Sequence, residues 1–165
     1  IPIFWTRELG TSPEQGSFAL TVFFSIGIFM TYIGGLLGDK YGPIKIIRLS
    51  LLVWLPAMFL LTEVPTFSPL IMMPIAYLLL LMIGAAKAIS YSPVIVLGQT
   101  YLAKSIGFAS GITLGVSQTI GGVIAPVVGN LADTYSLPVA MMTLVPFLVM
   151  GLGASLILKD PKKLQ

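Results

Sequence analysis

The sequence contains no cysteine and no histidine, and only 9% of its 165 residues are charged. Without cysteine the chain has no disulfide and no thiolate nucleophile, and without histidine it lacks the commonest zinc ligand and acid–base group. It also has no paired carboxylates and no glycine-rich phosphate loop with its lysine, so the sequence predicts neither an enzyme nor a metal site. The net charge of +3 is too small, and the basic residues too scattered, to indicate a nucleic-acid partner.

The shortage of charge accompanies an excess of apolar residues, which make up 56% of the chain and give a mean hydropathy of +1.00. A soluble domain carries about 25% charged residues, so too few charges remain to cover a surface in water. The apolar residues come in long runs, and a run of about 20 residues crosses a bilayer as a helix. These runs do not alternate with polar residues as barrel strands do. Composition therefore predicts an all-α, polytopic bundle of transmembrane helices, with the lipid bilayer as a partner.

Five complete apolar spans and the end of a sixth follow one another along the chain. The expected spans are residues 1–5 (partial), 16–37, 46–62, 69–99, 106–132 and 138–158, with a polar tail at 159–165. The span at 69–99 is long for one crossing and contains Pro93, so we expect it to be tilted or kinked. Because the chain begins inside an apolar run, we expect it to be a piece of a longer protein.

Basic residues divide unequally between the two sides of this topology. If residues 38–45 lie in the cytoplasm, only Arg7 among the Lys and Arg residues of the loops lies outside. The cytoplasmic set is Lys40, Lys45, Arg48, Lys104, Lys159, Lys162 and Lys163. Such a bias is typical of multi-pass proteins, whose cytoplasmic loops are enriched in Lys and Arg. It predicts a protein of the cell membrane with its C-terminus in the cytoplasm.

Two short stretches of the chain resemble each other. Residues 35–41 and 129–135 both read Gly-x-Leu-small-Asp-x-Tyr, and the predicted topology places them at opposite faces of the membrane. Three spans related to three others by inversion produce this arrangement, which recurs in secondary transporters. The alternative is chance, because helix ends often carry Gly and Asp.

The first of these stretches contains a recognisable loop pattern. Gly35, Asp39, Lys40 and Gly42 fit Gly-x-x-x-Asp-(Arg/Lys)-x-Gly, while two following basic positions of the pattern are occupied by Pro43 and Ile44. The pattern resembles the loop motif of the major facilitator superfamily, and the resemblance covers the whole chain. It implies the C-terminal half of that fold, from the end of helix seven to helix twelve, with an N-terminal half as partner.

The resemblance also implies a role for the inner turn. Asp39 would stabilise one conformation by bonding to helix ends across the inner face, as a gate, because a carboxylate is stabilised near the N-terminus of a helix. The alternative is a solvated turn, containing Lys40, that only sets the topology.

A closer likeness is to the fosmidomycin-resistance group of drug exporters. It rests on Ser92–Gln99, on Gly107–Gly111, on Gly121-Gly122 and on Gly129–Asp133. This resemblance implies proton-coupled efflux of a small molecule, an anionic drug or metabolite being the first candidate, with no cofactor beyond the proton gradient. An uptake carrier for organic anions or sugars, and a helix bundle that transports nothing, remain alternatives.

Lys87 is the side chain that most strongly indicates function. It lies about 12 residues from the inner end of its span, roughly 18 Å deep at 1.5 Å per residue, which is too deep for the ammonium to reach the surface easily. A charge at that depth usually faces a cavity or a partner. The partner is the other half of the protein, a substrate anion, or none if Lys87 loses its proton. Substrate or proton coupling and a structural ion pair with the other half both remain open.

Other polar and small residues complete the predicted site. We expect Ser90, Tyr91 and Gln118 to lie along the substrate or proton pathway with Lys87, although Ser hydroxyls equally often bond carbonyls of their own helix. Small residues spaced by four share one helix face and let two helices approach closely. Such a packing face is predicted at Gly107, Gly111, Gly115 and Gly122.

Overall fold

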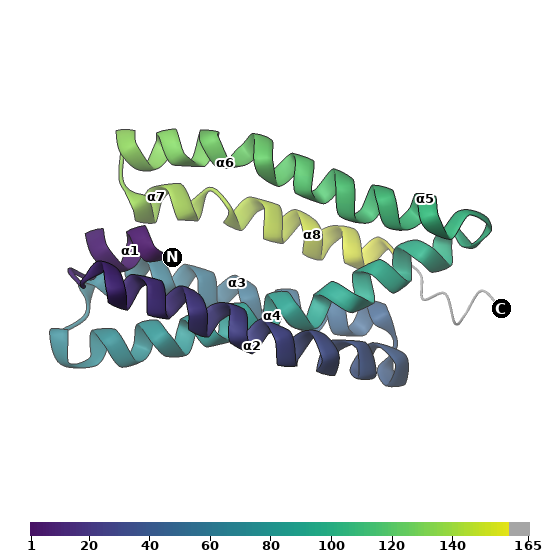
Figure 1. The fold of residues 1–165 in the computed structure, drawn as a ribbon, viewed down its shortest axis with the longest axis horizontal. Helices are drawn as coiled ribbons and strands as arrows, with labels where there is room; N and C mark the ends of the chain where they lie inside the picture. The colour runs from purple at the N-terminus through teal and green to yellow at the C-terminus, as the bar shows by residue number, and fades with distance from the viewer. Residues whose placement is uncertain (159–165) are drawn as a thin grey trace.

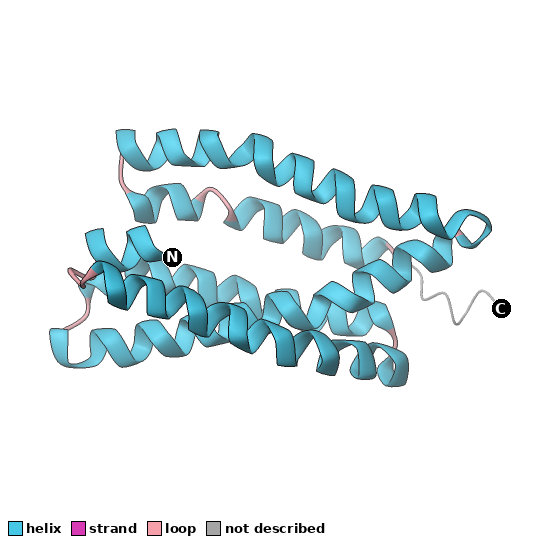
Figure 2. Cartoon of the chain, viewed as in Figure 1, coloured by secondary structure: helices cyan, strands magenta, loops and turns pink. Residues whose placement is uncertain are grey.

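The computed structural model describes residues 1–158 and contains, within them, helices and no strand (Figure 2). The predicted tail at 159–165, with Lys159, Lys162 and Lys163, lies outside the described residues. The α-helices are α1 (Pro2–Arg7), α2 (Pro13–Tyr41), α3 (Pro43–Glu63), α4 (Pro69–Tyr101), α5 (Ile106–Gly111), α6 (Ser117–Thr134), α7 (Leu137–Met142) and α8 (Val145–Ile157). The shorter helical elements are η1 (Val64–Thr66), η2 (Ala103–Ser105) and η3 (Ile112–Val116).

The long helices begin where local chemistry favours a helix start. Pro13, Pro43 and Pro69 each occupy the first position of α2, α3 and α4, where a missing N–H costs no hydrogen bond. Ser12 also caps α2: its Oγ accepts from the Gln15 N–H at 3.3 Å, and Gln15 Oε1 accepts from the Ser12 N–H at 3.4 Å. The predicted spans for the first two of these helices begin at residues 16 and 46, three residues after the prolines that start α2 and α3, and the third begins at residue 69, where α4 starts.

Five helical segments of the described chain are long and apolar enough to cross a membrane. They are Pro13–Tyr41, Pro43–Thr66, Pro69–Tyr101, Ala103–Thr134 and Leu137–Ile157. This confirms the predicted fold class, an all-helical bundle with several membrane-spanning helices. The long helices run roughly alongside one another (Figure 1), with α4 packed against both α2 and α3 and with α8 against α3.

Two of the segments are less regular than the sequence indicated. The segment at 103–134 contains a π-helical stretch, η3, between α5 and α6. The last segment is divided at Thr143–Leu144 into α7 and α8. Pro146 lies in the first turn of α8, where its missing N–H costs no hydrogen bond within that helix. In contrast, α4 continues unbroken from Pro69 to Tyr101 through Pro74 and Pro93.

Buried side chains gather mainly around α1. Trp5 is 0% exposed and meets the ring of Tyr77 edge-on at 5.6 Å, with Phe4, Val64 and Leu80 also fully or almost fully buried. This cluster joins α1, α3 and α4 at the end of the bundle that the topology places outside. A smaller cluster of Ile44, Ile47 and Leu97 joins α3 to α4 near the opposite end.

Candidate transport site

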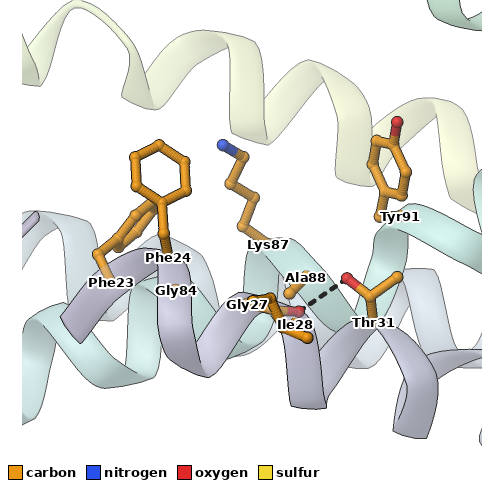
Figure 3. A pocket seen from close by; sticks show the side chains of 9 residues that line it. All are labelled: Phe23, Phe24, Gly27, Ile28, Thr31, Gly84, Lys87, Ala88 and Tyr91. Atoms are coloured by element: carbon orange, nitrogen blue, oxygen red, sulfur yellow. Dashed lines mark hydrogen bonds between the residues drawn. The ribbon is translucent and has the colours of Figure 1, made fainter. Parts of the chain in front are cut away.

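A cavity of about 280 Å³ lies beside α2 and α4, near the middle of both helices. Nine residues line it: Phe23, Phe24, Gly27, Ile28 and Thr31 from α2, and Gly84, Lys87, Ala88 and Tyr91 from α4 (Figure 3). On each helix the lining residues recur every three or four positions, some of them as adjacent pairs, so each helix contributes one continuous face. Two of the predicted pathway residues, Lys87 and Tyr91, therefore face the same cavity.

The Lys87 ammonium points away from the backbone of α4 into this cavity (Figure 3). Its Nζ lies 5.4 Å from the centre of the Phe23 ring, within the range of a cation–π contact. None of the lining residues is acidic. Thr31, across the cavity, donates its hydroxyl to the carbonyl oxygen of Gly27 at 2.8 Å. The cavity is thus mostly apolar and carries one positive charge.

The other two predicted pathway residues lie outside this lining. The Ser90 hydroxyl donates to the Lys87 carbonyl oxygen of its own helix at 2.9 Å, which is the alternative that the sequence left open. Gln118 is an exposed residue of α6. The structure therefore brings together Lys87 and Tyr91 and adds Phe23 and Phe24, which the sequence did not indicate because they lie some 60 positions away in the chain.

The predicted gate motif covers the end of α2 and the turn to α3. Gly42 ends α2 with its N–H bonded to the Gly38 carbonyl oxygen at 2.9 Å, and its φ of 95° is a conformation that favours glycine. Asp39 and Lys40 are exposed in the last turn of α2, with the Lys40 Nζ 5.2 Å from the centre of the Tyr41 ring. The motif glycine is thus explained by backbone geometry, whereas the gate role of Asp39 stays a prediction.

The departure from the motif at Pro43 and Ile44 has a structural reason. Pro43 is the buried first residue of α3, and Ile44 is only 3% exposed in the cluster with Ile47 and Leu97. A lysine or arginine at either position would place its charge among apolar side chains, which is costly without a partner.

Close helix contact in the described residues occurs at different glycines from those predicted. A Cβ built on Gly34 would overlap the backbone of Ile89, and one on Gly84 would lie 2.9 Å from Ile26 Cγ2. Gly34 and Gly38 are spaced by four on α2, and a Cβ on Gly38 would meet Pro93 Cγ at 3.1 Å. The Gly-x-x-x-Gly spacing at 34–38 was the signal that could have located this α2–α4 contact.

The predicted packing glycines have open space beside them. A Cβ added at Gly107, Gly111, Gly115 or Gly122 would meet no atom within 4 Å among the residues the structure describes. Gly111 and Gly115 instead border a hollow of about 480 Å³ on the face of α5, η3 and α6. Within residues 1–158 this face packs against nothing at those glycines, so their packing role stays a prediction.

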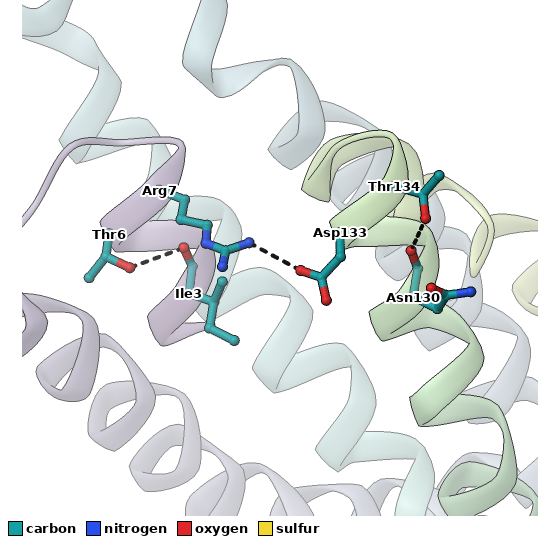
Figure 4. Close-up of polar contacts among 6 residues, drawn as sticks. All are labelled: Ile3, Thr6, Arg7, Asn130, Asp133 and Thr134. Carbon is teal, nitrogen blue, oxygen red and sulfur yellow. Dashed lines mark hydrogen bonds and ion pairs between the residues drawn. The ribbon is translucent and has the colours of Figure 1, made fainter.

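Two arginines make contacts that the sequence did not indicate. Arg48 of α3 donates from Nε to the Ser155 carbonyl oxygen of α8 at 3.0 Å. Arg7 of α1 forms an ion pair with Asp133 of α6, with Nη1 and Oδ1 3.4 Å apart (Figure 4). Nothing in the local pattern pairs residues more than 100 positions apart, so only the fold reveals these partners.

Comparison with known proteins identifies the family of the chain. The profile of the Major Facilitator Superfamily matches residues 1–165, the whole chain. The chain belongs to the major facilitator superfamily. The five helical segments of the described residues that are long and apolar enough to cross a membrane agree with this family.

One relative in this superfamily is the uncharacterized MFS-type transporter YfnC of Bacillus subtilis (strain 168). It is 31% identical over 151 residues, which cover 92% of this chain and 35% of the relative. The chain thus spans about a third of the length of the curated relative that it matches. No solved structure matches the chain. Together the superfamily and this relative support a multi-pass membrane transporter.

Proposed function

We propose that the intact protein is a proton-coupled exporter of a small anionic drug or metabolite, working in the cell membrane by alternating access. The observation that carries this proposal is Lys87, a positive charge near the middle of α4 that points into an apolar cavity lined by no acidic residue. In this proposal the chain is the C-terminal half, and it rocks against an N-terminal half around this cavity.

A lone ammonium at this depth is costly and needs a compensating charge or the loss of its proton. A substrate anion supplies the compensating charge when it enters the cavity. In the proposed exchange a proton enters the cell as the anion leaves it, so the proton gradient drives export. The likeness to the fosmidomycin-resistance group supports export as the direction, and the C-terminal tail is then cytoplasmic.

The experiment measures transport by the intact protein in proteoliposomes. Vesicles are loaded with radiolabelled fosmidomycin, a polar phosphonate, or with naphthalene-2-sulfonate, an apolar anion, and efflux is followed with and without an imposed pH gradient. We expect faster efflux of at least one anion when the pH is lower on the receiving side. Accumulation of the anion against its gradient in the direction that corresponds to entry into the cell would instead indicate an uptake carrier.

The variants compare two lysines of the same helical hairpin. Lys87→Gln removes the charge in the cavity, whereas Lys104→Gln removes an exposed charge at the η2 turn. We expect Lys87→Gln to slow transport strongly and to remove its dependence on pH, and Lys104→Gln to leave both unchanged. If Lys87→Gln transports with the rate and pH dependence of the wild type, Lys87 has no part in the mechanism.

A further inference from the structure

The Lys87 cavity combines one charge with several apolar surfaces. The rings of Phe23 and Phe24 and the side chain of Ile28 come from α2, and Lys87 and Tyr91 come from α4 (Figure 3). Phe23 and Phe24 also meet each other at nearly right angles, with their ring centres 5.6 Å apart. The two aromatic rings therefore lie next to the cation, since the centre of the Phe23 ring is 5.4 Å from Nζ of Lys87.

Few polar groups are available to a ligand in this cavity. The Thr31 hydroxyl already donates to the Gly27 carbonyl oxygen. The Tyr91 side chain lies one helical turn beyond Lys87 on the same side of α4. On the α2–α4 side of the cavity, a ligand covered with hydroxyl groups, such as a sugar, would find few hydrogen-bonding partners for its polar atoms, and each unpaired buried group is costly.

The charge balance is equally one-sided. Pro69–Tyr101 contains no Asp or Glu, and the acidic residues of α2, Glu14 and Asp39, lie in its first and last turns. The ammonium at mid-helix therefore attracts an anion, while a cationic ligand would place a second positive charge in a surrounding of low polarity. The hollow of about 280 Å³ is open on the side away from α2 and α4, where the side chains of Phe24 and Ile28 are 59% and 75% exposed.

We infer that this cavity binds an amphipathic organic anion: one compact anionic group on an apolar body of one or two rings. The ammonium of Lys87 pairs with the carboxylate, sulfonate or phosphonate group, and Phe23, Phe24 and Ile28 contact the apolar body. This inference rests on the proposed function, because it names the substrate class of the same site. It also ranks the two anions of the transport assay, with the apolar one preferred over the polar one.

The test measures equilibrium binding to the purified intact protein in detergent by isothermal titration calorimetry. Three probes separate the features: naphthalene-2-sulfonate has both anion and rings, methanesulfonate has only the anion, and a naphthyl trimethylammonium ion has rings with the opposite charge. We expect the first to bind and each of the other two to bind at least about tenfold more weakly, since each lacks one of the two interactions.

Variants assign the binding to this cavity. Lys87→Gln is expected to weaken naphthalene-2-sulfonate binding by at least about tenfold, because it removes the positive charge that pairs with the sulfonate, while Lys87→Arg keeps most of the affinity. Phe24→Ala is expected to weaken naphthalene-2-sulfonate binding but not methanesulfonate binding. The matched control Lys104→Gln should bind like the wild type. Elution as a single peak in size-exclusion chromatography shows that each variant is folded, and Lys87→Arg and Phe24→Ala test the inference if Lys87→Gln does not fold.

Failure of the inference is distinguishable from failure of the proposed function. Equal binding of the cationic and anionic naphthyl probes, or unchanged binding by Lys87→Gln, overturns the substrate class. If fosmidomycin is transported while naphthalene-2-sulfonate does not bind, the protein is an exporter of a different class of anion. If naphthalene-2-sulfonate binds through Lys87 but no anion crosses the membrane, the site is as inferred and the transport function is wrong.

Discussion

Arg48 of α3 holds the last turn of α8 through the carbonyl oxygen of Ser155. Both Nε and Nη2 donate to this oxygen, at 3.0 and 2.5 Å, and Nη2 also reaches the Leu158 carbonyl oxygen at 3.4 Å. The last carbonyls of a helix have no partner within the helix and form the negative end of its dipole. The guanidinium gives these carbonyl oxygens a hydrogen-bond donor and places a positive charge at the negative end of the dipole. Arg48 is therefore a structural link between two membrane-spanning segments as well as a basic residue of the predicted inner side.

Replacing Arg48 should loosen the contact between α3 and α8. We expect Arg48→Gln to lower the free energy of unfolding by about 1.5–3 kcal/mol, the contribution typical of hydrogen bonds from a charged group. Thermal unfolding of the purified intact protein in detergent measures the effect. Lys45→Gln is the matched control, because Lys45 is an exposed cation one turn earlier on α3. Equal melting temperatures for the two variants would show that the Arg48 contact contributes nothing.

Alanine substitutions at two glycines should have opposite consequences. Gly34→Ala places a Cβ against the backbone of Ile89, which forces α2 and α4 apart, and we expect a strong loss of folded protein. Gly107→Ala meets no atom of the described residues within 4 Å, and alanine favours the helix by about 1 kcal/mol. Yield and monodispersity by size-exclusion chromatography compare them. A loss at Gly107→Ala as large as that at Gly34→Ala would indicate that another helix packs there, as the sequence analysis predicts.

The ion pair between Arg7 and Asp133 should show that α1 lies close to α6, while contributing little to the stability of the protein. Their side chains are 62% and 73% exposed, so the ion pair contributes only about 0–1 kcal/mol. We therefore expect Asp133→Asn to change the melting temperature less than Arg48→Gln does. The double variant R7C/D133C should be joined by a short bifunctional maleimide, whereas R7C with K104C should not. Equal cross-linking of both pairs would contradict the placement of α1 beside the end of α6.

The predicted topology has a direct chemical test, because the chain contains no native cysteine. A membrane-impermeant maleimide applied to intact cells should label the variant E63C, in a predicted outer loop. It should label K104C, in a predicted inner turn, only after the membrane is opened. Cysteines elsewhere in the intact protein are first replaced by serine. Labelling of both variants from the same side would show that the helix order across the membrane is wrong.

The features that depend on neighbouring residues were predictable from the sequence. Apolar runs of sufficient length identified the membrane-spanning helices. The prolines at positions 13, 43 and 69 fit the first position of a helix, a local signal that the predicted spans used only at Pro69. The loop pattern at Gly35–Gly42 indicated the superfamily that the profile match confirms. Lys87 was recognisable because a single lysine in a long apolar run is unusual whatever its neighbours are.

Only the tertiary structure decided which faces meet. Periodicity shows that Gly34 and Gly38 share a helix face, and that Gly107 and Gly111 share another. It does not show which of the two faces packs against a neighbouring helix. Among the described residues, the face of Gly34 and Gly38 has a neighbour and that of Gly107 and Gly111 has none. The same holds for Phe23 beside Lys87 and for Arg48 beside Ser155. The physical reason is that a helix forms through bonds between residues four apart, whereas contacts between helices depend on how whole side-chain surfaces fit together.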